Sequence, residues 1–196
     1  MHLHHNLMAL AAAGAIFLAP ATSFADAASE AAQMAATPVQ ATDDSAAPTI
    51  GMPNPMVPAA SYGELTEALG VHPLYFPLSS GLELQQRFLI GGTVADLRYA
   101  SRYGAPEKRA QFTVRTAVAD PSEMTAEALS GVYGADWQTM TIGNTEVQLA
   151  EVSESAFVAY WTKDGVCFSV GAENVNRWDF LRQVRDNLID LTEHFY

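Results

Sequence analysis

Residues 84–100 read LQQRFLIGGTVADLRYA, and this stretch decides the fold. Two runs in which apolar and polar residues alternate, 84–90 and 93–100, flank the pair Gly91-Gly92. Alternation with a period of two is typical of a strand with one buried face. Glycine accepts the positive φ angles that a tight turn between antiparallel strands needs. The stretch therefore predicts a β-hairpin.

The same period continues towards the C-terminus. Short turns such as Gly143-Asn144 and Lys163-Asp164-Gly165 separate most of these runs. Connections this short join antiparallel neighbours, since parallel strands need long crossovers. We therefore predict an antiparallel meander of about 6–7 strands. Its further strands are expected at 111–118, 137–142, 145–152, 156–162 and 166–171, with a helical turn at 122–129.

Two helices are expected to complete an α+β fold. Ser61 can cap a short helix that runs to Leu69 and stops at Gly70, and Glu64 stands at the capping-box position. Asn176 can cap a longer one. Its apolar residues recur every three or four positions and predict a stripe against the sheet, although such a stripe could also dock on a membrane or a partner. The stripe contains Val175, Trp178, Leu181, Val184, Leu188, Leu191 and Phe195.

The N-terminal region predicts export. An apolar run of about thirteen residues, too short to span a bilayer, precedes Pro20 and the small-residue cleavage pattern Ser23-Phe24-Ala25. We expect 1–25 to be a signal peptide, although no Lys or Arg precedes the run, and a buried helix or an uncleaved anchor is the alternative. Residues 26–48 read as a disordered Ala-rich linker, and 49–196 as the α+β domain. The expected location is the periplasm or the cell surface.

Charge and composition exclude several functions. The chain has a formal net charge of −12, which repels nucleic acid and anionic lipid headgroups. The single Cys167, within a predicted strand, is expected to be a buried small side chain, and one cysteine excludes an internal disulfide. Acidic residues are scattered, and no Gly-x-Ser-x-Gly motif occurs. A strand rather than a helix follows Gly91-Gly92, so no phosphate cradle is predicted. We therefore predict no catalytic residue, no metal and no cofactor.

Several motifs resemble, in their order, those of a family. They are Gly51-Met-Pro-Asn-Pro55, Leu69-Gly70-Val71, the segment 90–97, Ser130-Gly131-Val132-Tyr133, and the segment 159–165 before the terminal helix. Together they are similar to a bacterial extracytoplasmic domain of unknown function, found in exported and membrane-anchored proteins with this Gly-Met-Pro-Asn-Pro opening. The resemblance covers roughly residues 50–190. It implies an α+β fold with an antiparallel sheet, and it implies no activity and no site residues. This chain departs from it in a longer 120–129 stretch.

Aromatic residues are the remaining functional signal. In the run 156–162, Phe157, Ala159 and Trp161 face one way and Val158 and Tyr160 the other, so both faces carry large side chains. We expect the terminal helix to cover one face and the N-terminal helix to cover part of the other. The alternative is an aromatic-lined sheet face that accepts a ligand or peptide. The candidate binding residues are Tyr75, Tyr99, Trp137, Tyr160 and Trp161.

These observations predict a non-enzymatic envelope module that binds a protein or an apolar ligand. The competing hypothesis is an enzyme with an unrecognised site, such as a hydrolase directed at the cell wall. A third possibility is a structural module of the cell surface with a flat polar sheet face. A concavity lined by apolar and aromatic side chains would favour binding, and a converging acid and base would favour the enzyme.

Overall fold

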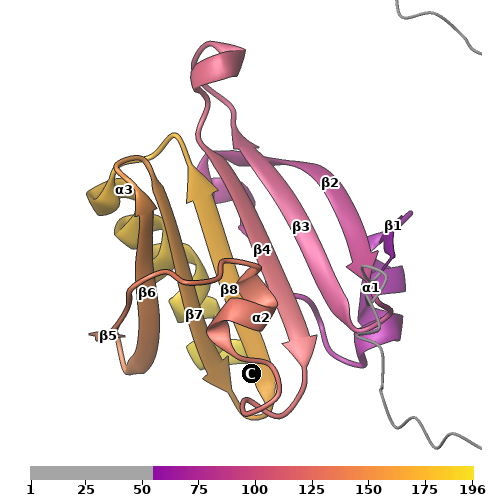
Figure 1. Cartoon of the computed structure of the whole chain (residues 1–196). Helices are drawn as coiled ribbons and strands as arrows, with labels where there is room; N and C mark the ends of the chain where they lie inside the picture. Colours follow the sequence, from indigo (N-terminus) through magenta and orange to yellow (C-terminus); the bar gives the residue numbers. More distant parts are fainter. Residues whose placement is uncertain (1–54) are drawn as a thin grey trace, which may run out of the picture. The chain divides into compact units, whose positions relative to one another are not determined.

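The computed structural model describes residues 55–196, in which one antiparallel sheet carries helices on both faces (Figure 1). Its strand order is β1-β2-β3-β4-β8-β7-β6-β5. The predicted signal peptide and linker lie outside the described residues. Within them, no helix has the length and apolar character to cross a membrane. The strands are β1 Met56–Pro58, β2 Leu82–Ile90, β3 Val94–Ser101, β4 Gln111–Val118, β5 Trp137–Ile142, β6 Thr145–Ser153, β7 Ala156–Lys163 and β8 Val166–Glu173.

The sheet is antiparallel, as predicted, but the prediction of a single meander of about 6–7 strands is wrong. The sheet has eight strands because β1, with Pro58 in it, pairs with Phe88–Ile90 at the sheet edge, where a proline is tolerated. The eight form two consecutive meanders, β1 to β4 and β5 to β8, joined by the antiparallel pair β4–β8. This arises because the segment 119–136 crosses the sheet and brings β5 to the far edge.

The local signals at the hairpin and the helix starts are confirmed. Gly91 and Gly92 have φ angles of 58° and 76°. The Glu64 N–H donates to Ser61 Oγ at 3.1 Å, and the Asp179 N–H donates to Asn176 Oδ1 at 2.9 Å. The helices are α1 Tyr62–Leu69, α2 Ala126–Ser130, α3 Arg177–Gln183 and α4 Asp190–Phe195.

The C-terminal helix packs on the sheet as predicted, but two residues of the predicted stripe are exposed. Trp178 is 67% exposed and Phe195 is 77% exposed. The buried face repeats every fourth residue instead, through Phe180, Val184, Leu188 and Thr192. Such a repeat drifts around an α-helix of 3.6 residues per turn. A π-helical segment, Val184–Ile189, separates α3 from α4, and its wider turn keeps these residues on one face.

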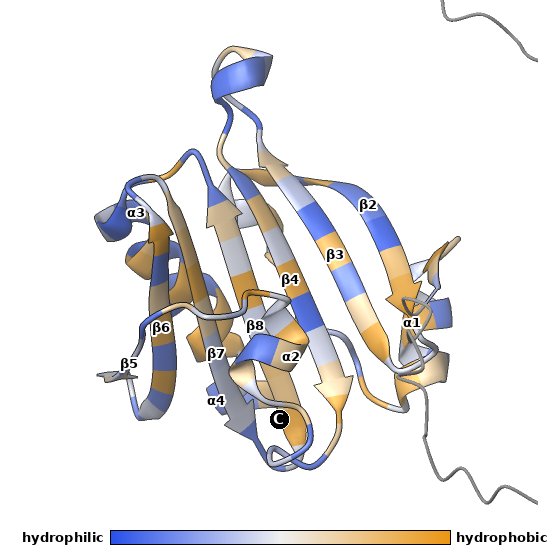
Figure 2. Ribbon diagram, viewed as in Figure 1, coloured by the Kyte–Doolittle hydropathy of each residue, from blue (hydrophilic) through white to orange (hydrophobic). Residues whose placement is uncertain are grey.

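The opposite face of the sheet is covered by α2, and the expectation that the N-terminal helix covers it is wrong. Leu65 of α1 belongs to the same core as Phe180 of the C-terminal helix, so these two helices share one face. The other face carries α2 (Figures 1 and 2). Leu129 of α2 packs there with Tyr160 and Cys167. Cys167 is fully buried, as predicted.

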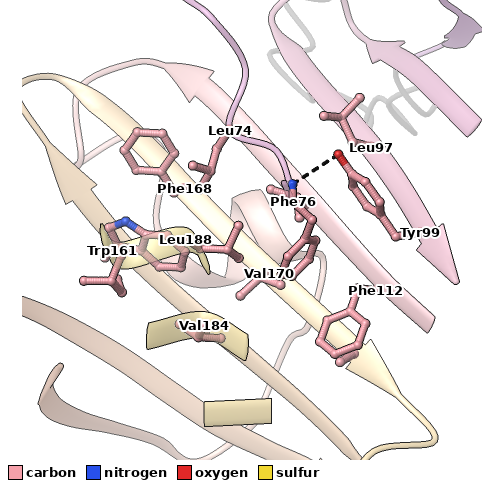
Figure 3. Close-up of a cluster of buried hydrophobic side chains, with 14 of the residues drawn as sticks. Leu74, Phe76, Leu97, Tyr99, Phe112, Trp161, Phe168, Val170, Val184 and Leu188 are labelled. Atoms are coloured by element: carbon pink, nitrogen blue, oxygen red, sulfur yellow. Dashed lines mark hydrogen bonds between the residues drawn. The ribbon is translucent and has the colours of Figure 1, made fainter. Parts of the chain in front are cut away.

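Residues 72–78 cross the face of the sheet that carries α1 and the C-terminal helix, and we call this segment the strap. It is extended up to Pro77, and Leu78 begins a short 3₁₀ turn. Its backbone is held by side chains and not by strand pairing. The Leu74 N–H donates to Thr116 Oγ1 at 2.9 Å. The Phe76 N–H donates to the Tyr99 hydroxyl at 3.3 Å (Figure 3). Leu74 and Phe76 are buried. Two polar groups in the apolar core thus fix the path of the strap.

The Thr116 hydroxyl has no replacement as the acceptor for the strap. In Thr116→Val the buried Leu74 N–H loses its partner at nearly constant side-chain volume, so the free energy of unfolding is expected to fall by about 1–3 kcal/mol. Chemical denaturation measures this. The control Thr113→Val changes a half-buried threonine on the other face of the same strand and is expected to change stability by less than about 0.5 kcal/mol. Equal losses in both variants would contradict the role of the hydrogen bond.

Candidate ligand-binding groove

A groove of about 1090 Å³ lies between the strap, the start of β2 and the end of α4. We call it the strap groove. Its lining is mainly apolar and aromatic and comes from segments that lie far apart in the sequence. These segments contribute, among others, the side chains of Tyr62, Leu74, Leu78, Leu84, Val166 and Leu191. The volume is that of a site for a small molecule or for a few side chains of a partner.

Large apolar side chains stand exposed at this groove. Leu78 of the strap is 83% exposed and Phe195 of α4 is 77% exposed, while Tyr75 is about half-exposed. All three line the groove. Isolated exposed apolar residues are ordinary, but a group of them around an apolar concavity marks an interaction site.

The polar groups of the strap groove do not form a catalytic arrangement. His72, Glu83, Arg102 and Asp164 line it, and no ion pair joins any two of them. Among the described residues, no group of His, Cys, Asp and Glu is placed to hold a metal ion. The Tyr62 hydroxyl donates to the Pro73 carbonyl, and the Tyr196 hydroxyl donates to the His72 carbonyl. These tyrosines therefore hold the strap.

The tyrosines that hold the strap are kept neutral by their surroundings. Burial raises the pKa of Tyr99 to about 12, and burial also raises the pKa of Tyr196 to about 12. Burial likewise raises the pKa of Tyr62. Both the Tyr62 and the Tyr196 hydroxyls donate to strap carbonyls, so ionisation would remove these hydrogen bonds and place a charge beside the core.

These pKa shifts predict a loss of stability in alkali. The unfolded chain releases tyrosine protons near pH 10, whereas the folded chain holds those of Tyr99 and Tyr196 to about pH 12. Stability from these groups is therefore complete below pH 10 and is lost as the pH rises through 12. Denaturation measured between pH 8 and 12 checks this, and Tyr99→Phe should flatten the decline. If stability declined equally steeply with pH in Tyr99→Phe, ionisation of Tyr99 would not contribute to the loss.

The structure divides the five sequence-predicted binding residues among different places. Tyr75 and Tyr99 both line the strap groove, Tyr75 exposed and Tyr99 buried against Phe76. Trp161 is buried on the same sheet face, and its ring stacks on Phe168. The other two residues lie elsewhere, as described next.

Tyr160 and Trp137 belong to the opposite face of the sheet. The buried Tyr160 hydroxyl donates to the Met124 carbonyl at 2.7 Å. Trp137 at the start of β5 packs on the buried side chains of α2 and of the sheet beneath it, which we call the α2 cluster: Ala117, Ala126, Leu129, Tyr160 and Cys167. Leu78, Phe195 and Tyr196 are among the groove residues that the sequence reasoning missed. The helical stripe did include Phe195, which was expected to pack on the sheet, with docking on a membrane or a partner as the alternative. No sequence signal distinguishes its exposure from that of the other stripe residues.

A second, polar concavity lies beside Glu193 of α4, next to Tyr160 and Trp161 of β7. Glu193 Oε1 accepts from the Asn144 N–H at 2.7 Å and from Thr145 Oγ1 at 3.1 Å. This carboxylate therefore fixes the turn between β5 and β6 to α4, which is a structural use.

The comparisons with known proteins add no relative. A scan against protein-family models finds no match to this chain, and a search of curated proteins finds no significant similarity.

Proposed function

We propose that this chain is an exported, non-enzymatic envelope module that binds an apolar ligand, or an apolar segment of a protein, in the strap groove. The observation that carries the proposal is the coincidence of a large apolar concavity with the exposed side chains of Leu78 and Phe195. Burying such side chains against a ligand is favourable in proportion to the apolar area removed from water.

The competing proposal, a hydrolase, has less support. General acid–base catalysis needs two titratable groups within reach of one substrate atom. In the strap groove, His72 Nδ1 lies 3.4 Å from Thr66 Oγ1 and pairs with no acid among the described residues. The proposed export and the resemblance to the extracytoplasmic family support the binding proposal, because an acidic, single-cysteine domain with an apolar groove suits a carrier or sensor outside the cytoplasm.

Binding of an apolar fluorescent probe tests the proposal. N-phenyl-1-naphthylamine is expected to bind the domain saturably with increased fluorescence. Phe195→Glu places a carboxylate at the groove and is expected to weaken this binding about tenfold or more, equivalent to about 1.4 kcal/mol. Because Phe195 is exposed, the variant should fold normally.

Tyr133→Glu is the matched control. Tyr133 is an aromatic residue of similar exposure, 72%, and does not line the strap groove. The variant Tyr133→Glu introduces the same charge as Phe195→Glu, but away from the groove. Its affinity for the probe is therefore expected to stay within about twofold of that of the wild type. Absence of saturable binding, or equal weakening in both variants, would refute the proposal.

A further inference from the structure

One end of β2 has no strand on its outer side. β1 pairs with β2 only at Phe88–Ile90, and the Ala59 N–H donates to the Arg87 carbonyl before the chain turns away towards α1. Residues 82–86 of β2 therefore form a free edge among the described residues. An edge strand presents unpaired backbone groups that can pair with another chain.

The pairing pattern identifies which backbone groups face outward. The Arg102 N–H donates to the Gly81 carbonyl, so this is a hydrogen-bonded pair between β2 and β3. Such pairs alternate along an antiparallel ladder, which makes Glu83 and Ala100 the next one. Leu84 therefore directs its N–H and C=O away from β3, towards the free edge.

The same stretch borders the strap groove. Leu82, Glu83 and Leu84 all line the groove. Leu82 and Leu84 belong to the core face of the sheet, whereas the Glu83 side chain is exposed and alternates to the other face. Side chains that stand opposite each other on neighbouring antiparallel strands lie on the same face. A peptide paired with this edge would therefore place every second side chain beside Leu82 and Leu84, at the groove, and the intervening ones beside Glu83.

We propose that the ligand of the strap groove is an extended peptide segment that adds to the free edge of β2, with apolar residues at alternate positions and basic residues between them. This inference rests on the proposed function and names its ligand class. Backbone hydrogen bonds to Leu84 hold the strand, and apolar side chains enter the groove.

Charge favours this occupant over a second copy of the chain. A net charge of −12 attracts a basic peptide, and Glu83 lies between the two groove-lining leucines. Edge-to-edge pairing of two copies would bring two acidic chains together. A β-bulge between Leu84 and Gln86 confines regular pairing to a few residues, so affinity depends on the side chains in the groove as well as on the edge.

The test compares three peptides that differ in pattern or backbone. The first is Lys-Val-Lys-Val-Lys-Val, the second is its isomer Lys-Lys-Lys-Val-Val-Val, and the third is the first with N-methylated valines. Displacement of the naphthylamine probe from the full mature chain measures their affinities. We expect the alternating peptide to bind at least tenfold more tightly than either control. Amide hydrogen exchange at Leu84 should slow at least tenfold when it binds.

Each outcome separates this inference from the proposed function. If the probe binds but the three peptides displace it equally, or Leu84 exchange is unchanged, edge addition is refuted while apolar binding stands. If the probe does not bind, the proposed function fails. A dimer in sedimentation experiments that protects Leu84 without peptide would identify a second copy as the occupant and overturn the peptide. Leu84→Pro, which removes the outward N–H, should abolish the preference for the alternating peptide, and N-methylation answers the same question if that variant does not fold.

Discussion

Phe180→Ala is expected to lower the free energy of unfolding by about 3–5 kcal/mol, the cost of removing a buried aromatic ring and leaving a cavity. Phe180 is fully buried in α3. Its ring lies parallel to Phe112 of β4 at 6.5 Å and to Phe157 of β7 at 5.6 Å. One side chain of the C-terminal helix therefore contacts both meanders, and its loss weakens the helix and the join between them.

Urea denaturation followed by circular dichroism measures this effect. The control is Trp178→Ala, two residues earlier in the same helix. Trp178 is mostly exposed, and the Arg182 guanidinium lies 4.6 Å from its ring centre, so its removal is expected to cost less than about 1 kcal/mol. If Phe180→Ala were no more destabilising than Trp178→Ala, the core described above would be incorrect.

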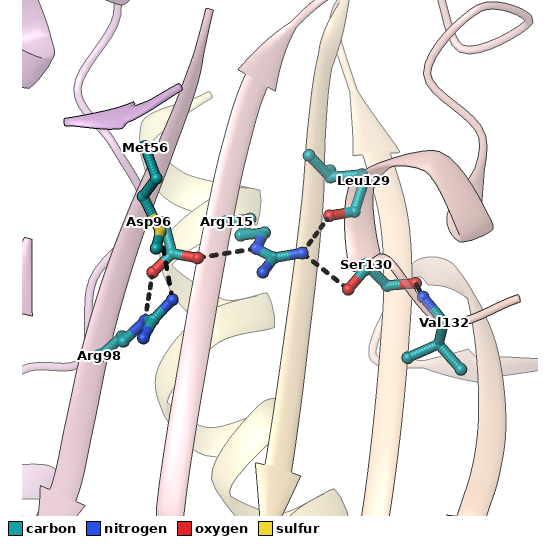
Figure 4. Close-up of polar contacts among 7 residues, drawn as sticks. All are labelled: Met56, Asp96, Arg98, Arg115, Leu129, Ser130 and Val132. Atoms are coloured by element: carbon teal, nitrogen blue, oxygen red, sulfur yellow. Dashed lines mark hydrogen bonds and ion pairs between the residues drawn. The ribbon is translucent and has the colours of Figure 1, made fainter. Parts of the chain in front are cut away.

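Arg115→Met is expected to cost about 3 kcal/mol, because it removes one of the two partners of a buried carboxylate and also the hydrogen bonds to two carbonyls of α2. The fully buried Asp96 accepts from Arg115 Nε at 2.8 Å and from Arg98 Nε at 3.0 Å (Figure 4). Arg115 Nη1 also donates to the carbonyls of Leu129 and Ser130, at 3.0 and 2.7 Å. These carbonyls end α2, so Arg115 fastens that helix to the sheet.

The control for this variant is Arg98→Met. The Arg98 side chain is 37% exposed, against 23% for Arg115, and does not contact α2. It is expected to cost about 1 kcal/mol. A second readout is the reactivity of the Cys167 thiol, which is buried in the α2 cluster. Burial raises the pKa of this thiol. Its reaction with an aromatic disulfide reagent should accelerate in Arg115→Met and not in Arg98→Met. Unchanged thiol reactivity in both would show that Arg115 does not hold α2.

Several elements were predictable because neighbouring residues suffice to specify them. Ser61 and Asn176 cap helices through hydrogen bonds to amides three positions ahead, and the glycine pair at 91–92 makes the hairpin turn. Alternation in β7 correctly separated Tyr160 from Trp161. The candidate site was predicted only in part, because Tyr75 and Tyr99 meet at the groove while Trp137, Tyr160 and Trp161 do not.

The strap shows why the rest of the site could not be predicted. Its path depends on Thr116 and Tyr99, which lie 42 and 23 positions away from the amides they accept from. The alternation that identifies a strand gives no information on which hydroxyl will meet which distant N–H.

The amino-acid sequence by itself therefore determined strands β2 to β8, the turns, the caps and the α+β class, since these depend on contacts within a few residues. Strand β1 was not among them, because it forms only by pairing with the distant end of β2. The tertiary structure alone decided the β4–β8 pairing, the placement of α2, the π-helical turn and the groove. Each of these depends on pairs distant in sequence, whose meeting is governed by packing and by the hydrogen-bond needs of buried groups. The free edge of β2 has the same origin, because it exists only where the chain leaves β1 to form α1.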